Sequence, residues 1–310
     1  MSLDNKDHER EEERVLVENP LIKEIAKKTD SEFTRSILKL FARAFLHYTK
    51  IGKLHQDRTD SGLTGIEGIE FFLNELNADI TIDEESLRES IPEKGPFIVV
   101  ANHPLGIKDG WALLQEIGRI RPDLKFVVRE FFENSGFDEL LIITSKNKTG
   151  SKEDEMKEAR VLIQEFGKAI EEEKGIIFFP YGLVSRDSKK LTEGEWNTTA
   201  LKFAKRKKIP VIPMHIESRN SKFFYEISKL DAFFKKSFEK LGLKYKENLL
   251  SEAFIARELF HEDPINITVG ERIDPESSSH MGNSPEELKK LTDAIKAKVF
   301  TLVEGADEKE

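Results

Sequence analysis

The apolar residues of this chain follow two patterns that take turns along the sequence. Helical spacing of apolar residues alternates with short, continuous apolar runs. The runs lie at residues 97–101, 125–128, 140–144, 175–179, 211–216 and 265–269. A helix between two strands brings the chain back in the same direction, so this alternation predicts an α/β domain with a mostly parallel central sheet.

The region before the first run is predicted to be helical. After the N-cap residues Asp30 and Ser31, apolar residues recur at helical spacing over residues 33–51, and Gly52 is a plausible stop. The opposite side of this helix carries basic side chains, which we call the basic stripe: Arg35, Lys39, Arg43, His47 and Lys50. Two interpretations stay open, a helix packed on the main domain with its cations in solvent, or a helix lying on anionic lipid.

The same patterns divide the chain into four segments. We expect a flexible charged lead-in at residues 1–30, an N-terminal helical segment at 31–84, the α/β domain at 85–275, and a C-terminal helix with an acidic tail at 276–310. A second helix is predicted from Gly65 to Asn77, followed by a polar connector. In the last helix Ser284 is the expected N-cap, Pro285 the first helical residue, and Glu287 completes a capping box.

Composition and charge exclude several classes of protein. The 310 residues, 38% of them hydrophobic, suit one large domain with a small addition, and the net charge of −9 disfavours general nucleic-acid binding. The chain has no cysteine, which excludes disulfides, thiolate metal sites and thiol nucleophiles. No run approaches the roughly 20 apolar residues of a membrane-spanning helix, and the acidic stretch at residues 9–14 is unlike a secretory signal. We therefore expect a cytoplasmic protein.

The first candidate site follows the first apolar run. Residues 99–110 read V-V-A-N-H-P-L-G-I-K-D-G, so His103 stands just beyond the predicted strand end. Catalytic and ligand-binding groups of open α/β sheets gather at this edge. Asp109, across a glycine-containing turn, could form a dyad with His103 and fix its tautomer. A histidine that only caps a helix would give the same pattern, so this pair alone does not decide between the two.

Two other apolar runs also end in polar clusters. Residues 175–186 read G-I-I-F-F-P-Y-G-L-V-S-R and place Ser185 and Arg186 where backbone amides and a guanidinium could bind an anionic head group. Residues 209–220 read I-P-V-I-P-M-H-I-E-S-R-N. The polar residues that follow these three strands could lie together at one edge of the sheet.

Together these motifs resemble those of the glycerophospholipid acyltransferases, the PlsC-like superfamily, which carry N-H-x4-D, F-P-E-G and V-P-V-x-P blocks. The chain is most similar to the branch labelled hemolysin, with N-H-P-L-G-x-x-D-G, F-P-x-G-x-x-S-R, a tryptophan-containing stretch and G-R-N-S-x-x-F-Y. The corresponding stretches here are residues 102–110, 179–186, 193–196 and 219–225. The resemblance covers residues 65–269, and the ordered combination is far more specific than any single block.

The resemblance implies a lipid O-acyltransferase of phospholipid metabolism. A fatty acyl group would pass from acyl-CoA or acyl carrier protein to a hydroxyl of a lysophospholipid-like or other lipid acceptor, with His103 as general base and Asp109 as its orienting partner. The implied substrate-binding residues are Asn102, Gly106, Pro180, Tyr181, Gly182, Ser185, Arg186, Arg219 and Asn220. No metal or further cofactor is expected, and the protein would act peripherally on the cytoplasmic face of an anionic membrane.

Two positions depart from the superfamily pattern. His103 and Asp109 are separated by five residues rather than four, which requires a turn at Gly106 to absorb the extra residue. Tyr181 stands where the lysophosphatidate enzymes have the glutamate of F-P-E-G, a residue associated with holding the glycerol phosphate acceptor. The identity of the acceptor therefore stays open.

A second class of function also stays open, a catalytically silent, membrane-peripheral binding protein. It would suit the basic stripe and a Phe–Lys run made of Phe223, Phe224, Phe233, Phe234 and Phe238 with Lys235, Lys236 and Lys240. The phenylalanines are otherwise core residues or a wall for acyl chains. The cations at 202–208 either end a helix or contact an acidic carrier or lipid, and His261 with its acidic neighbours lacks metal-site spacing.

Overall fold

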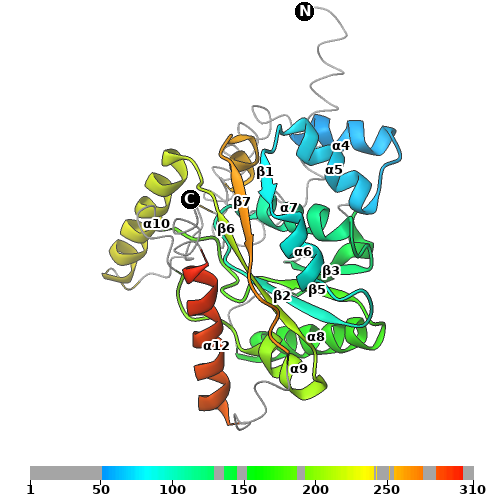
Figure 1. Cartoon of the computed structure of the whole chain (residues 1–310). Coiled ribbons are helices and arrows are strands. Elements are labelled where there is room, and N and C mark those ends of the chain that lie inside the picture. Colours follow the sequence, from blue (N-terminus) through cyan, green and yellow to red (C-terminus); the bar gives the residue numbers. More distant parts are fainter. Residues whose placement is uncertain are drawn as a thin grey trace, which may run out of the picture. The chain divides into compact units, whose positions relative to one another are not determined.

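The computed structural model describes residues 51–128, 136–144, 152–186, 193–240, 242, 251, 255–274 and 284–302 (Figure 1). The basic stripe, which ends at Lys50, lies outside them. The chain divides into two compact units. In the described residues, one unit holds the sheet with its helices, and the other holds α4 (Ile51–Asp60), α10 (Lys222–Lys240) and the short 3-10 helix η3 (Ile255–Phe260).

The larger unit is built on a seven-stranded sheet in the order β1-β7-β6-β2-β5-β3-β4. Its strands are β1 (Ile80–Ile82), β2 (Phe97–Ala101), β3 (Leu124–Val128), β4 (Leu141–Ile143), β5 (Gly175–Phe178), β6 (Val211–Glu217) and β7 (Ile265–Val269). All neighbouring pairs are parallel except β6 and β7. The predicted α/β class with a mostly parallel sheet is confirmed.

Two features of the sheet differ from the sequence prediction. The predicted polar connector contains the edge strand β1 and the helix α6 (Glu84–Ser90), whose N-cap Asp83 accepts the Glu85 N–H at 3.0 Å. β1 has only three residues, I-T-I, and is too short to show a period. β7 runs antiparallel to β6, and residues 221–261 between the two strands belong to the other unit.

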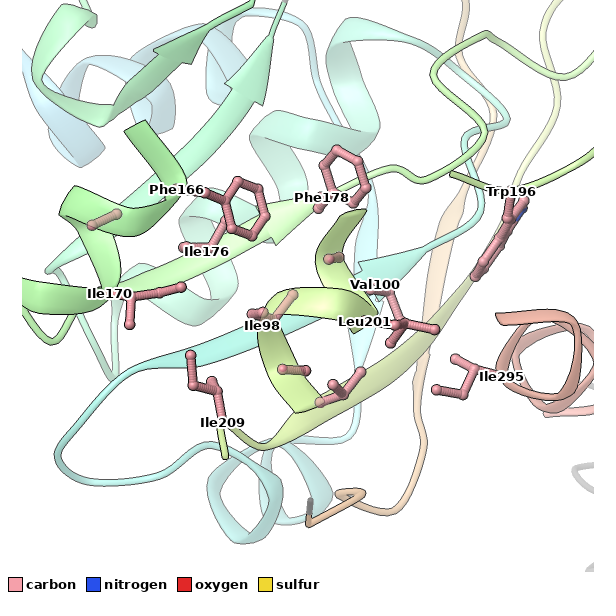
Figure 2. Close-up of a cluster of buried hydrophobic side chains, with 14 of the residues drawn as sticks. Ile98, Val100, Phe166, Ile170, Ile176, Phe178, Trp196, Leu201, Ile209 and Ile295 are labelled. Carbon is pink, nitrogen blue, oxygen red and sulfur yellow. The ribbon is translucent and has the colours of Figure 1, made fainter. Parts of the chain in front are cut away.

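Helices pack on both faces of the sheet. On one face, α8 (Lys152–Glu171), α9 (Thr199–Lys207) and α12 (Pro285–Thr301) each contribute buried apolar side chains that pack with Ile98 and Val100 of β2. In Figure 2 this cluster brings Phe166 of α8 against Phe178 of β5, an edge-to-face ring pair with centroids 5.7 Å apart. The cap of α12 is the predicted one, because Ser284 and Glu287 form a reciprocal capping box.

The opposite face of the sheet carries α5 (Gly65–Glu75) and α7 (Ile107–Gly118). α7 approaches β3 so closely that a Cβ added at Gly110 would lie 2.3 Å from Cζ of Phe126. A residue with a side chain at this position would therefore force the helix and the strand apart. The last glycine of the N-H-P-L-G-x-x-D-G block thus has a packing reason.

The Phe–Lys run lies on α10 and is not uniformly buried. Phe224 is fully buried, whereas Phe233 is 62% exposed and its neighbour Leu230 is 41% exposed. Ser221 precedes α10 and donates from both its backbone N–H and its hydroxyl to Glu258, at 2.6 and 2.8 Å. The core interpretation therefore holds for Phe224 and is wrong for Phe233.

Two further observations concern helices that could contact a membrane or an acidic partner. No helix among the described residues combines the length and the apolar character needed to cross a bilayer. α9 ends with Lys205, Arg206 and Lys207 in its last turn and with Lys208 at a left-handed C-cap. Cations at this end of a helix interact favourably with its dipole, as one of the two sequence interpretations stated.

Candidate active site

Three neighbouring strands end at one edge of the sheet and deliver the candidate residues there. β2 lies between β5 and β6, parallel to both, with Val100 opposite Phe178 and Ala101 opposite Met214. The segments that follow these strands therefore meet beyond the same edge. This is the edge at which open α/β sheets place their ligands.

His103 and Asp109 face each other across the turn between β2 and α7. Nδ1 of His103 lies 3.1 Å from Oδ2 of Asp109. The turn is made by Gly106, whose φ of 92° is the left-handed region that favours glycine, and Asp109 sits in the first turn of α7. The Gly106 turn thus absorbs the extra residue between histidine and aspartate.

The backbone of the turn holds the Asp109 carboxylate in place. Oδ2 accepts the N–H groups of Leu105 and Gly106, at 2.9 and 3.2 Å, and Oδ1 accepts the N–H of Gly110 at 2.9 Å. The Asp109 side chain is fully buried. The carboxylate is therefore held in one position as the partner of the imidazole, and it is shielded from solvent.

The imidazole of His103 is held on one face and reaches the surface. It stacks on Phe179, with ring centroids 4.2 Å apart and an interplanar angle of 15°, and its side chain is 16% exposed. In the tautomer that carries its proton on Nδ1, the ring donates to Asp109 and Nε2 has a free lone pair. Within the described part of the chain no hydrogen bond reaches Nε2, so this atom is available as a base.

Asn102 and Asn220 use their side chains to hold the edge together. The Asn102 amide is fully buried, donates to the Ile216 carbonyl at 2.8 Å and accepts the Ile216 N–H at 2.7 Å. The Asn220 amide donates to the Pro104 carbonyl at 2.8 Å. Both residues lock the His103 turn to β6 and the segment after it.

The F-P-x-G-x-x-S-R segment makes a second turn beside His103. The Gly182 N–H donates to the Phe179 carbonyl at 3.0 Å with a φ of 67°, and the Pro180 carbonyl accepts the Asn197 N–H at 2.8 Å. Tyr181 is half-buried and packs against Gly194, where an added Cβ would lie 2.9 Å from the tyrosine ring. The tyrosine that replaces the family glutamate thus packs on the loop that follows.

Ser185 and Arg186 have different surroundings. Ser185 is fully buried, its N–H donates to the His103 carbonyl at 2.8 Å, and its hydroxyl donates to Glu193 at 3.2 Å. The half-buried Arg186 donates to the Val184 carbonyl at 3.2 Å. The Ser185 hydroxyl is therefore engaged within the protein, and its backbone N–H, one of the amides expected to face an anionic head group, is bonded to His103.

Arg219 lies on the segment after β6 with an exposed side chain. Its backbone N–H donates to Asp263 at 2.6 Å, and Asp263 also accepts the Ser218 hydroxyl at 3.0 Å. These bonds fix the backbone of the segment. The guanidinium is positioned at the surface.

Sequence reasoning did not single out Glu193, which is central to the geometry of this edge. Its Oε1 accepts the His103 backbone N–H at 2.6 Å, and its Oε2 accepts the Trp196 indole N–H at 2.6 Å. Burial raises the pKa of the Glu193 carboxyl, against the opposing effect of these hydrogen bonds and of His103. The only sequence signal was the E-x-x-W spacing in the tryptophan-containing stretch.

A half-buried histidine oriented by a buried carboxylate at a strand-end edge is typical of enzymes that use general-base catalysis. The sequence model of the acyltransferase family matches residues 69–273 of this chain. The chain belongs to that family, and the protein is an acyltransferase. The family resemblance inferred from the motifs is confirmed.

The chain is also similar to two lyso-glycine lipid O-acyltransferases. The protein from Phocaeicola vulgatus is 28% identical over 235 residues, which are 71% of this chain and 75% of the relative. The protein from Bacteroides thetaiotaomicron is 28% identical over 225 residues, 70% of this chain and 75% of the relative. Among solved structures, the 1-acyl-sn-glycerophosphate acyltransferase PlsC from Thermotoga maritima aligns over 87% of this chain and 97% of its own, with 19% identity and a TM-score of 0.44.

Proposed function

We propose that this acyltransferase moves a fatty acyl group from the thioester of acyl-CoA or acyl carrier protein to a hydroxyl of a lysolipid. The observation that carries the proposal is the His103–Asp109 pair, 3.1 Å apart, in which the His103 side chain is 16% exposed and, within the described part of the chain, no hydrogen bond reaches Nε2. A base in this position can accept the proton of a hydroxyl that attacks a thioester.

The reaction proceeds by direct transfer. Nε2 of His103 takes the proton of the acceptor hydroxyl as its oxygen attacks the thioester carbonyl carbon, and Asp109 stabilises the imidazolium that forms. The carbon–sulfur bond then breaks, and the thiolate leaves with the proton from the imidazolium. The new ester bond, the free thiol and the neutral histidine balance the reaction, and no cofactor beyond the thioester takes part.

Arg186 is the proposed contact for an anionic group of the acceptor. Its guanidinium lies one residue beyond Ser185, which is bonded directly to the His103 carbonyl, so the cation and the base belong to adjoining turns. A guanidinium can bind a phosphate or a carboxylate through two parallel hydrogen bonds. The exposed Arg219 is a second candidate contact.

The acceptor is proposed to be a lysolipid whose head group fits beside the turn that carries Tyr181. Both named relatives act on a lyso-glycine lipid, and Tyr181 replaces the glutamate associated with glycerol phosphate in the lysophosphatidate enzymes. Lyso-glycine lipid and lysophosphatidate are therefore the two acceptors to compare first. Transfer to one and not the other would assign the acceptor class.

The test of the proposed function is product formation from a labelled donor. The purified protein is incubated with labelled acyl-CoA or acyl carrier protein and with a lipid extract or the two acceptors, and mass spectrometry identifies the products. His103→Ala serves as the matched inactive variant. A protein that folds and binds lipid vesicles but transfers no acyl group would favour the silent binding protein instead.

We also propose that the protein reaches its acceptor by peripheral binding to an anionic membrane on the cytoplasmic face. Support comes from one exposed face of α10, where Leu230 and Phe233 lie beside the exposed Lys236 and Lys240, while Lys229 on the same face pairs with Glu226 at 2.6 Å. The helix has five lysines against three acidic residues in a chain of net charge −9. An apolar strip flanked by lysines matches the chemistry of an anionic lipid surface.

Vesicle sedimentation tests this surface without reference to activity. Each lysine near an anionic bilayer contributes on the order of 1 kcal/mol, so Lys236→Glu with Lys240→Glu is expected to weaken binding by about tenfold or more. The control is Lys94→Glu with Lys290→Glu, an equal charge change at two exposed residues that are not part of α10. Equal weakening by both double variants, or binding that does not respond to salt, would contradict an α10 contact.

A further inference from the structure

Glu193 links the two turns of the candidate active site through one buried carboxyl group. The residue is only 6% exposed. Oε1 accepts the His103 backbone N–H at 2.6 Å and the Ser185 hydroxyl at 3.2 Å, while Oε2 accepts the Trp196 indole N–H at 2.6 Å. Partners from three separate segments therefore converge on this side chain.

The chemistry of these partners requires an acceptor at both oxygens. A backbone N–H and an indole N–H can only donate hydrogen bonds, and the serine hydroxyl donates here. A carboxylate accepts at both of its oxygens, whereas an amide or a protonated carboxyl presents a donor at one of them. Among side chains of this length, a glutamate carboxyl group satisfies this set, whereas a glutamine amide cannot.

The same contacts hold the main chain of His103 from both sides. Glu193 takes its N–H, and the Ser185 N–H donates to its carbonyl at 2.8 Å. Because the Ser185 hydroxyl returns to Glu193, the three residues form a closed ring of hydrogen bonds. The imidazole can keep its direction toward Asp109 only while the backbone that carries it stays in place.

The Glu193 segment is itself fixed from behind. Lys296 of α12 donates to the carbonyls of Glu193 and Gly194, at 2.5 and 2.7 Å. Trp196 is buried in the core cluster between α8, α9 and α12. The Glu193 segment is thus held by α12 and by the core, so its carboxylate is a fixed anchor for the backbone of the His103 turn.

We propose that Glu193 is a positioning residue of this acyltransferase, whose carboxylate holds the main chain of His103 so that the imidazole keeps the geometry of a base. The inference rests on the proposed function, because it assigns His103 that role. Glu193 touches no reacting atom. Its loss should affect the rate of transfer more than the binding of the donor.

The test begins with Glu193→Gln and its control Glu195→Gln. The same chemical change at Glu195 lies in the same loop, on an exposed side chain that pairs with Lys289 at 2.6 Å. A displaced reacting group costs up to about 100-fold in rate, so Glu193→Gln is expected to lower kcat by roughly 10- to 100-fold with the donor KM within about twofold of wild type. Glu195→Gln is expected to leave both constants unchanged.

A double variant tests whether the loss of kcat in Glu193→Gln comes from its amide NH₂ facing the Trp196 indole N–H. In Glu193→Gln an amide oxygen that faces the His103 N–H and the serine hydroxyl turns its NH₂ toward the Trp196 indole N–H, and the repulsion between these two donors displaces the side chain and with it the His103 main chain. Trp196→Phe removes that opposing donor. The double variant is therefore expected to be at least about threefold faster than Glu193→Gln alone, a rescue by a second substitution that a general packing role does not predict.

The outcomes separate this inference from the proposed function. Wild-type protein that transfers no acyl group would remove the proposed function itself. If His103→Ala abolishes transfer while Glu193→Gln keeps a wild-type kcat, the positioning role is wrong and the general base stands. If Glu193→Gln does not fold, the double variant carries the test, and a double variant that neither folds nor turns over would overturn the inference.

Discussion

Replacing Asp109 by asparagine separates a catalytic orienting role from that of a turn residue. Asparagine has the shape of aspartate but can accept at only one of the two oxygen positions. If its oxygen takes the place of Oδ2, it keeps the bonds to Leu105, Gly106 and His103, and the NH₂ then faces the Gly110 N–H across about 2.9 Å. The flipped amide would oppose more donors, so the first orientation is expected.

This orientation predicts two separate effects of Asp109→Asn, one on the unfolding free energy and one on kcat. One buried backbone N–H is left without an acceptor, which costs about 1–3 kcal/mol of unfolding free energy. The imidazole keeps its tautomer but loses the negative charge that stabilises the imidazolium, so kcat is expected to fall by roughly 100- to 10,000-fold. That fall corresponds to about 3–5 kcal/mol in the activation free energy.

The assay measures kcat by acyl transfer and stability by denaturant unfolding on the same preparations. The matched control is Asp83→Asn at the N-cap of α6, where asparagine caps as well as aspartate and the side chain bonds Glu85 and Ser86 of its own helix. Asp83→Asn is expected to change neither quantity appreciably. If Asp109→Asn loses stability but transfers within about threefold of wild type, Asp109 is a structural residue of the turn and the dyad is refuted.

Three further outcomes follow from the same geometry. Arg186→Ala should raise the acceptor KM more than the donor KM, with only partial rescue by lysine, and an unchanged acceptor KM would contradict the anion contact. Burial lowers the pKa of His215, which bonds the Val299 carbonyl at 3.0 Å, so the folded state resists its protonation. The contribution of neutral His215 to the unfolding free energy is complete above the ordinary pKa of 6.5 and falls at lower pH. Between roughly pH 7 and 5.5, denaturant unfolding should therefore show a smaller loss of unfolding free energy for His215→Asn than for wild type. Gly110→Ala should destabilise by about 1–3 kcal/mol through contact with Phe126, and Phe126→Leu should recover part of that loss in thermal unfolding; no recovery would place the clash elsewhere.

The elements that the sequence predicted are those whose pattern is local. The six apolar runs became strands because β-branched and aromatic residues between helical stretches leave few alternatives. The Ser284 cap and the Gly106 turn were also visible, since each depends on residues within a few positions. The short strand β1 and the antiparallel direction of β7 were not, because both are decided by distant pairing partners.

The candidate site divides in the same way. His103 and Asp109 lie six positions apart, so their pairing could be inferred from one turn. Glu193 lies 90 positions from His103, and no period or local motif links the two. Ser185 was placed correctly near the edge, but the use of its hydroxyl depends on Glu193. Contacts between separate loops decide such details, and a single sequence does not display them.

Single-turnover transfer by wild type and His103→Ala tests the central claim most directly. The two proteins are mixed with labelled acyl donor and saturating lysolipid, and the appearance of the acyl ester is followed with time, with circular dichroism showing that both are folded. The general-base mechanism predicts that the alanine variant forms the ester roughly 100- to 10,000-fold more slowly. Ester formation by folded His103→Ala within a few-fold of the wild-type rate would contradict it.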